Sequence, residues 1–316
     1  MTRTRIVVLG DPHIEYPVAD GWEDIIADIN SLAPDKVFIV GDLTGYGPSI
    51  GTNEATRHAV EILNQLHFPW FSTIGNHDME AKTFATDEEA IQSFLSCVGR
   101  ETPWFRTEVG PITVLGLSTT FFRRNTVCQH EVVFEDEQLA WFEEQLRDLA
   151  GKPVFVIAHN PPIGSGVITL PELHAQGGNM VVNQNRCPGR IMNIVWRNPN
   201  ILAWFSGHNH LGHQYCNAIS VTLGVHFVHC GVAGAKTRDG RRHSRVVDIY
   251  PEYMDILTYD HIAKDFDRGC AYREPNSLQA LLDWRNATKS RLYVPRDPVT
   301  LRQGPPVASG LCRPSG

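Results

Sequence analysis

The stretch Ile6-Val7-Val8-Leu9-Gly10-Asp11-Pro12-His13 joins four consecutive apolar residues to an aspartate and a histidine. An uninterrupted apolar run that ends at a glycine predicts a strand buried on both faces. Apolar residues at helical spacing follow between positions 22 and 32, Pro34 ends that helix, and a second apolar run over 36–40 leads to Asp42. We therefore expect a β-α-β unit with Asp11, His13 and Asp42 at the exits of parallel strands.

The same arrangement recurs further along the chain. Predicted strands over residues 69–74, 154–158 and 201–205 lead to Asn76-His77-Asp78, to His159, and to the pair His208 and His210. Open α/β sheets bind ligands outside the carboxyl ends of their strands, where exit loops converge. One Gly-Asp pair after a strand is usually a turn, but five such groups in order exclude that interpretation. The sequence thus predicts one site built from five strand exits.

The remaining patterns predict an α/β protein with a hairpin and a second sheet. Two runs around Gly110-Pro111 form the hairpin, and helices are expected over residues 55–66, 87–97, 136–149 and 190–197. Short runs between 213 and 260 are expected to form an antiparallel second sheet. We predict a catalytic domain over 1–261 and a C-terminal tail over 262–316, partly extended, with one short helix over 278–289.

Composition narrows the classes of function. The formal net charge is −7; residues 262–316 hold nine Lys/Arg and five Asp/Glu, so the tail carries +4 and the rest −11. An acidic body argues against nucleic-acid binding. Seven cysteines without a Cys-x-x-Cys pair favour neither a disulfide framework nor a zinc ribbon. The first residues are too few for a signal peptide and no run is long enough to span a membrane, so we expect a soluble, cytoplasmic protein.

The five groups resemble the motifs of the calcineurin-like metallophosphoesterase superfamily, namely D-x-H, G-D-x-x, G-N-H-D, a single H, and G-H-x-H, over residues 6–211. The resemblance implies a four-layer α/β/β/α sandwich with two mixed β-sheets and the metal site at the strand C-terminal ends. Spacing alone lets Asp11 and His13 bind one ion, with Asp42 bridging to a second. The resemblance adds His210 to the first metal and implies that the second is bound by Asp42, Asn76, His159 and His208.

Mixed nitrogen and oxygen ligands favour Mn, Fe or Zn ions, which are the cofactors we expect. Two divalent ions, two carboxylates and a bridging hydroxide leave a charge of about +1, which attracts a phosphate. The neutral Asn76 preserves that charge, and its NH2 group is expected to point toward the substrate. The resemblance implies in-line attack by the metal-bridging hydroxide. His77 would protonate the leaving oxygen, and Asp78 would orient His77.

The function expected first is hydrolysis of small phosphodiesters of the cyclic nucleotide or glycerophosphodiester type. A phosphomonoesterase acting on proteins or nucleotides would use the same metals, and a non-catalytic interaction scaffold is a third alternative. The loop over 160–188 is expected to select the small-molecule substrate, through candidates such as His174, Asn185 and Arg186. Arg123 and Arg124 are either phosphate clamps or a solvated turn. Tyr46-Gly47-Pro48 is expected to shape the rim without a chemical role, and the sequence leaves the oligomeric state open.

Overall fold

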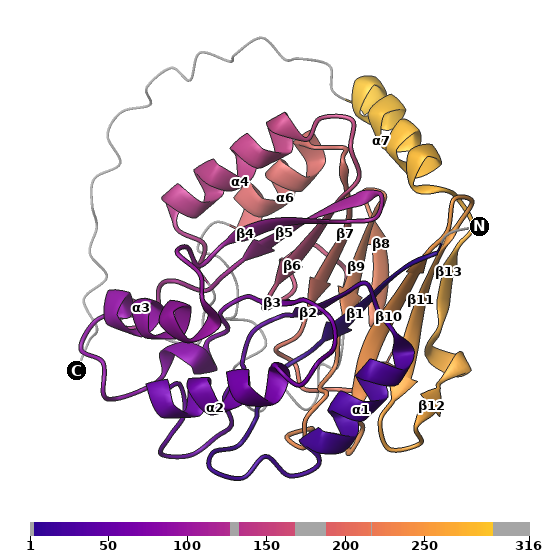
Figure 1. Ribbon diagram of the computed structural model, residues 1–316. Helices are drawn as coiled ribbons and strands as arrows, with labels where there is room; N and C mark the ends of the chain where they lie inside the picture. Colours follow the sequence, from indigo (N-terminus) through magenta and orange to yellow (C-terminus); the bar gives the residue numbers. More distant parts are fainter. Residues whose placement is uncertain (1–2, 127–132, 168–187, 216, 293–316) are drawn as a thin grey trace, which may run out of the picture.

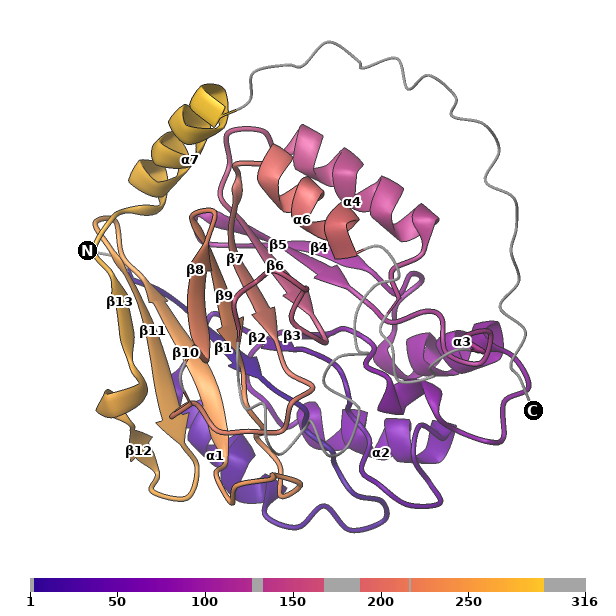
Figure 2. The same ribbon diagram turned by 180° about the vertical axis from the view of Figure 1, so that it is seen from behind.

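The computed structural model describes residues 3–126, 133–167, 188–215 and 217–292. Two sheets pack face to face, with α1, α2 and α3 outside one sheet and α4 and α6 outside the other (Figures 1 and 2). Three apolar cores fill the spaces between these layers: one beneath α1–α3, one between the sheets, and one beneath α4 and α6. The predicted four-layer α/β/β/α sandwich is confirmed.

The first sheet begins with the β-α-β unit that the opening stretch predicts. Strand β1 (Thr4–Leu9) pairs in parallel with β2 (Lys36–Ile39), with Leu9 opposite Ile39, and β2 pairs in parallel with β3 (Trp70–Ser72). Helix α1 (Trp22–Leu32) connects β1 to β2 and ends at Ala33, before Pro34. Because β1 and β2 end in register, the loops that carry Asp11 and Asp42 leave the sheet side by side.

The second sheet has a parallel centre and antiparallel edges. Strands β5 (Ile112–Leu117), β6 (Val154–Ala158), β7 (Ile201–Ser206) and β9 (Val225–His229) run in parallel, and the edges are β4 (Phe105–Val109) and β8 (Ile219–Thr222). The predicted hairpin over residues 105–117 is β4 and β5. The exits of β6 and β7 carry His159, His208 and His210.

The outer helices lie close to their predicted positions. They are α2 (Asn53–Leu63), α3 (Asp87–Val98), α4 (Asp136–Asp148) and α6 (Pro188–Arg197). Helix α3 has the sharpest start, because the Thr86 hydroxyl accepts from the Glu89 amide while the Glu89 carboxylate accepts from the Thr86 amide. Among the helices of the described residues, none is long and apolar enough to cross a bilayer.

The prediction of a separate antiparallel sheet from residues 213–260 is wrong. Strands β8 and β9 extend the second sheet, whereas β10 (His243–Ile249) pairs antiparallel with β1 and β11 (Met254–Asp260) pairs with β10 in the first. Every residue of β10 is buried, because the strand lies inside the first sheet and has neighbours on both faces. Such a strand has no alternating pattern that would identify its partner.

Residues beyond 261 contribute to the sandwich. Strands β12 (Asp265–Phe266) and β13 (Tyr272–Glu274) pair with β11, the 3-10 helix η2 (Arg268–Cys270) lies between them, and α7 (Leu278–Leu292) follows. Leu278 and Leu281 join the core between the sheets. The expected helix is present, but the strands were not anticipated. The division at residue 261 stays a prediction.

Candidate metal centre

The nine residues predicted for the site leave the two sheets at one edge, at the carboxyl ends of β1, β2, β3, β6 and β7. Five of the seven predicted ligands have left-handed backbone conformations, with positive φ at Asp11, His13, Asp42, His208 and His210. Positive φ is uncommon for residues other than glycine, and such backbone strain gathers at functional sites. The exit loops therefore adopt strained backbone conformations that orient their side chains, although an unstrained loop would be enough to connect the strands.

One group of side chains gathers His13, Asp42, His77 and His210, each offering an atom within 4.8 Å of the others. The Nε2 atoms of His13 and His210 are 2.9 Å apart, and Asp42 Oδ2 lies 3.8 Å from Nε2 of His13. His13 donates from Nδ1 to the Thr44 carbonyl at 3.0 Å. That hydrogen bond leaves the Nε2 of His13 bare, which is the tautomer needed to bind a metal.

A second group gathers Asp42, His159 and His208 in the same way. His159 donates from Nδ1 to the Val40 carbonyl at 2.9 Å and turns Nε2 toward Asp42 Oδ2, 3.2 Å away. The same Nε2 lies 3.0 Å from Nδ1 of His208 and 3.0 Å from Oδ1 of Asn76. This group thus contains four of the predicted ligands.

Asp42 belongs to both groups. Its Oδ1 accepts from the His77 amide at 2.9 Å, whereas its fully buried Oδ2 has no hydrogen-bond partner in the part of the chain described. An unpaired buried carboxylate oxygen surrounded by histidine nitrogens is costly unless a cation lies among them. The residues present therefore fit two metal ions that share the Asp42 carboxylate.

Asp11 is less closely engaged than predicted. Both of its oxygens accept from the amide of His208, at 2.9 and 2.7 Å, and Oδ1 is 3.6 Å from Nδ1 of His159. The carboxylate borders the cluster without entering either compact group. Its assignment as a ligand stays a prediction.

Glycines in the motifs make room for these carboxylates. A Cβ atom on Gly75 would lie 2.1 Å from Oδ1 of Asp42, and one on Gly207 would lie 2.4 Å from Oδ2 of Asp11. Any other residue would displace a carboxylate. The glycines of G-N-H-D and G-H-x-H are thus required by packing at the site.

Electrostatics favour the same conclusion. Burial lowers the pKa of His13 to about 4 and that of His210 well below its usual range, so both rings are neutral near pH 7. Burial would also lower the pKa of His159, but the nearby Asp42 raises it to about 9. The Asp42 carboxylate thus favours a positive charge in the space beside it.

We expected Asp78 to orient His77, and this expectation is wrong. The Asp78 carboxylate accepts the amides of Asp42, Leu43 and Gly75 at 2.8–2.9 Å. It holds the Asp42 loop against the Asn76 loop. Residues 77–79 form a 3-10 helix, in which side chains three apart lie above one another. Consequently Glu80 reaches His77, with Oε1 3.1 Å from Nδ1.

Glu80 also determines the orientation of Asn76. The Asn76 NH2 group donates to Glu80 Oε1 at 3.3 Å, which leaves Oδ1 facing His159. One hydrogen of this NH2 group is thus used by Glu80, and the expectation that the group points toward the substrate stays a prediction. The i, i+3 spacing from His77 was the signal for Glu80 in the sequence.

Tyr46 is a second residue whose role the sequence did not predict. Its hydroxyl lies 3.1 Å from Nδ1 of His210, and its ring stacks on His13 with centroids 4.7 Å apart. The ring also meets the edge of His77 at 4.8 Å. The only signal was the position of an aromatic hydroxyl four residues after Asp42.

The two candidate phosphate clamps have structural roles. Arg123 donates to the carbonyls of Met79, Ala81 and Phe84, and Arg124 pairs with Asp87 and Glu135, each at 3.2 Å. These contacts tie the segment after β5 to α3 and α4. The other candidates, His174, Asn185 and Arg186, lie outside the described residues.

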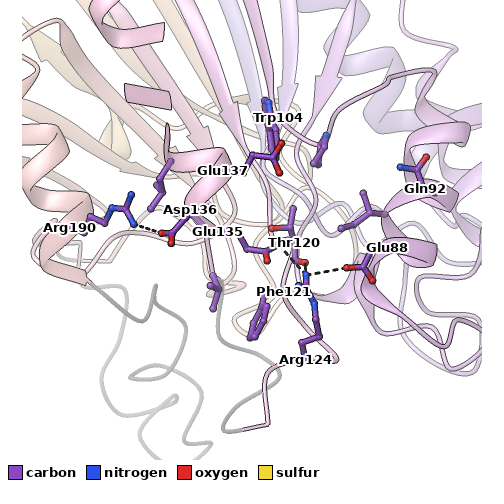
Figure 3. A pocket seen from close by; sticks show the side chains of 15 residues that line it. Glu88, Gln92, Trp104, Thr120, Phe121, Arg124, Glu135, Asp136, Glu137 and Arg190 are labelled. Carbon is purple, nitrogen blue, oxygen red and sulfur yellow. Dashed lines mark hydrogen bonds and ion pairs between the residues drawn. The ribbon is translucent and has the colours of Figure 1, made fainter. Parts of the chain in front are cut away.

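A cavity of about 710 Å³ lies between α3 and α4, apart from the predicted ligands (Figure 3). None of the nine predicted site residues lines it. Its arginines are engaged by carboxylates: Arg190 with Asp136, and Arg124 with Glu135 and Glu88. Among the described residues, the predicted site residues therefore gather at the strand exits and not in this cavity.

Comparisons with protein families and with curated proteins both find phosphoesterases. A family model described as calcineurin-like phosphoesterase matches residues 4–212. A glycerophosphodiester phosphodiesterase, GpdQ, of Enterobacter lignolyticus is 26% identical over 208 residues, and the match covers 64% of this chain and 67% of that protein. Residues 4–212, which the family model matches, contain all nine predicted site residues.

Solved structures share the fold at low sequence identity. A dimetal phosphatase from Danio rerio aligns with a TM-score of 0.62 at 11% identity, covering 87% of this chain and 99% of that one. The purple acid phosphatase PPD1 of yellow lupin gives 0.58 at 14%, covering 89% and 55%. GAP50, the anchor in the inner membrane complex of Plasmodium, gives 0.58 at 11%, covering 91% and 95%. At these identities the likeness concerns the fold.

Proposed function

The chain belongs to the calcineurin-like phosphoesterase family and is a metal-dependent phosphoric ester hydrolase, and we propose that its substrates are small phosphodiesters. The family uses a dinuclear metal centre, and the two overlapping histidine and aspartate groups could hold two ions. The observation that carries the metal centre is the buried Asp42 Oδ2, 3.2 Å from His159, 3.8 Å from His13 and 4.0 Å from His77. A carboxylate in that position can be shared by ions on either side.

Manganese, iron or zinc suits the donor set, because imidazole nitrogens and carboxylate or amide oxygens occur together without a thiolate. When bound, a pair of such ions activates water and stabilises negative charge on phosphoryl oxygens. Asp42, His13 and His210 would hold one ion, together with Asp11. Asp42, Asn76, His159 and His208 would hold the other.

His77 is the proposed proton donor to the leaving oxygen. Its side chain is 14% exposed at the edge of the cluster, and its Nε2 is 4.0 Å from Asp42 Oδ2. The Glu80 carboxylate, beside Nδ1, fixes the ring and favours its protonated form. Burial opposes protonation, but Asp42 and Glu80 together raise the pKa of His77. The ring can therefore carry the proton that a leaving alkoxide requires.

The curated relative supports a diester substrate. That protein is named a glycerophosphodiester phosphodiesterase, and it is 26% identical to this chain over 208 residues. The site residues alone suit phosphomonoesters as well, because the same metals would bind either phosphate. An experiment must therefore distinguish a diester substrate from a monoester substrate.

The test compares turnover of bis(p-nitrophenyl) phosphate and p-nitrophenyl phosphate by the Mn²⁺-reconstituted protein. We expect preference for the diester. His77→Ala should lower the rate by about 10²–10⁴-fold with metal content retained. The exposed His67→Ala is its matched control. Asp42→Asn should abolish both turnover and metal binding, whereas Asp148→Asn, whose side chain is 63% exposed, should change neither.

Preference for the monoester would overturn the diester proposal and favour a phosphatase. Stoichiometric metal with no turnover of either compound would favour a scaffold. A parallel fall in metal content and rate in His77→Ala would show that His77 acts as a ligand rather than an acid.

A further inference from the structure

The histidines of the metal centre differ in what holds their outer nitrogens. His13 and His159 each donate from Nδ1 to a main-chain carbonyl, of Thr44 and of Val40. A carbonyl can only accept, so these two rings have a fixed tautomer with Nε2 bare. For His210 the group beside Nδ1 is the Tyr46 hydroxyl, at 3.1 Å, which can either donate or accept.

The geometry around His210 decides between these alternatives. Its Nε2 lies 2.9 Å from the bare Nε2 of His13. Both nitrogens can face one cation only if His210 carries its proton on Nδ1. The Tyr46 oxygen must then accept that proton's hydrogen bond, and its own O–H is left to donate elsewhere. Tyr46 is 41% exposed, so the residue is partly open to solution.

The placement of Tyr46 is determined by its loop. The Gly45 amide donates to the Ile14 carbonyl at 2.8 Å, and Ile14 forms an isolated bridge with Thr44. A Cβ atom on Gly45 would lie 2.8 Å from the Cα of Glu15, so only glycine allows this close approach. The loop after Asp42 is thereby pressed against the loop after His13, and the Tyr46 ring stacks on His13.

We propose that Tyr46 positions His210 for metal binding and that its hydroxyl donates a hydrogen bond to a phosphoryl oxygen of the substrate. The inference rests on the proposed function, because it requires a metal beside His13 and His210. It gives Tyr46 two separable roles. As an acceptor it selects the tautomer of His210, and as a donor it contacts the substrate next to the metals.

The experiment uses the full chain, stripped of metal. Mn²⁺ is titrated by calorimetry into the wild type, into Tyr46→Phe and into Tyr16→Phe. Phenylalanine keeps the ring that stacks on His13 and removes only the oxygen. Tyr16 is a matched control, since it is 45% exposed and its ring contacts His58 instead of the cluster. We expect two Mn²⁺ binding events in the wild type, of which one weakens by about 10–100-fold in Tyr46→Phe and none in Tyr16→Phe.

The donor role is tested by titrating inorganic phosphate into each protein at saturating Mn²⁺. We expect phosphate to bind about 10-fold more weakly to Tyr46→Phe than to the wild type, the loss of one hydrogen bond to a charged group. Equal Mn²⁺ affinities would overturn the positioning role, and equal phosphate affinities would overturn the donor role. Equal weakening of both Mn²⁺ events would overturn a specific action on His210. A wild type that binds no Mn²⁺ would overturn the metal centre itself, and this inference with it.

Discussion

The Nε2 atoms of His13 and His210 lie 2.9 Å apart, although 197 positions separate the residues in the chain. Burial lowers the pKa of His13 to about 4 and that of His210 well below its normal value, so neither ring holds an extra proton near pH 7. Two nitrogens at this distance repel one another unless one of them donates or a cation lies between them. Because Asp42 Oδ2 faces the same space and has no hydrogen-bond partner among the described residues, a cation satisfies all three groups at once.

Removal of metal should therefore destabilise the fold. A ligand that binds only the native state, at a concentration of about 100 times its Kd, adds about 2.7 kcal/mol to the free energy of unfolding. We expect excess EDTA to lower the melting temperature, and Mn²⁺ added after removal of EDTA to restore it, as followed by circular dichroism. Asp42→Asn should melt at the same temperature with and without Mn²⁺. Equal melting temperatures for wild type in Mn²⁺ and in EDTA would contradict the prediction.

Asp78→Asn should cost stability as well as activity. The Asp78 carboxylate is buried and accepts three amides, from Asp42, Leu43 and Gly75. An asparagine NH2 group turned toward these donors would leave at least one of them unsatisfied. We expect a loss of about 1–3 kcal/mol in urea unfolding. Asp136→Asn is the control, since Asp136 is 92% exposed. Lost activity at unchanged stability would instead indicate a direct chemical role for Asp78.

The strand exits could be predicted because each depends on a few adjacent residues. The apolar run of β1 ends at Gly10, and the register of β1 and β2 follows from one β-α-β unit. The partner of β10 could not be predicted, because β10 is buried throughout and pairs with a strand more than 230 positions earlier. No pattern of neighbouring residues predicts that β10 pairs with β1.

Within the site, the sequence could not predict the directions in which side chains point. The motif includes Asp78, but the sequence does not show that its carboxylate points back to the amides of the Asp42 loop. Glu80 and Tyr46 act through the particular turns that follow Asn76 and Asp42. Their positions depend on backbone conformation, such as the 3-10 helix that brings Glu80 above His77.

Stability should depend on the charge of Asp87 at acid pH. Burial would raise the pKa of this carboxyl, but the amides of Arg123, Arg124 and Phe122 lower it below 3.8. A depressed carboxyl pKa stabilises the fold above the unfolded value, and that contribution disappears as pH falls through the folded value. We therefore expect Asp87→Asn to cost about 1–3 kcal/mol in urea unfolding at pH 7 and much less near pH 2.

Glu88→Gln, one residue further along, serves as the control for Asp87→Asn, because the Glu88 side chain is 64% exposed. Its effect should be small at both pH values. An equal cost of Asp87→Asn at pH 7 and pH 2 would mean that the shape of the side chain, and not its charge, holds the segment after β5.

Arg285→Ala should show that α7 folds as part of the sandwich. The Arg285 side chain is buried, and burial lowers its pKa to about 10. It donates to four main-chain carbonyls, those of Val195, Asn198, Pro199 and Leu223. Alanine would leave buried carbonyls without donors, so we expect a loss of about 2–3 kcal/mol in a single cooperative urea transition. Arg273→Ala, at a site 62% exposed, should change the free energy of unfolding far less than Arg285→Ala does. If the two variants unfold alike, the hydrogen bonds of Arg285 do not hold α7 to the sandwich.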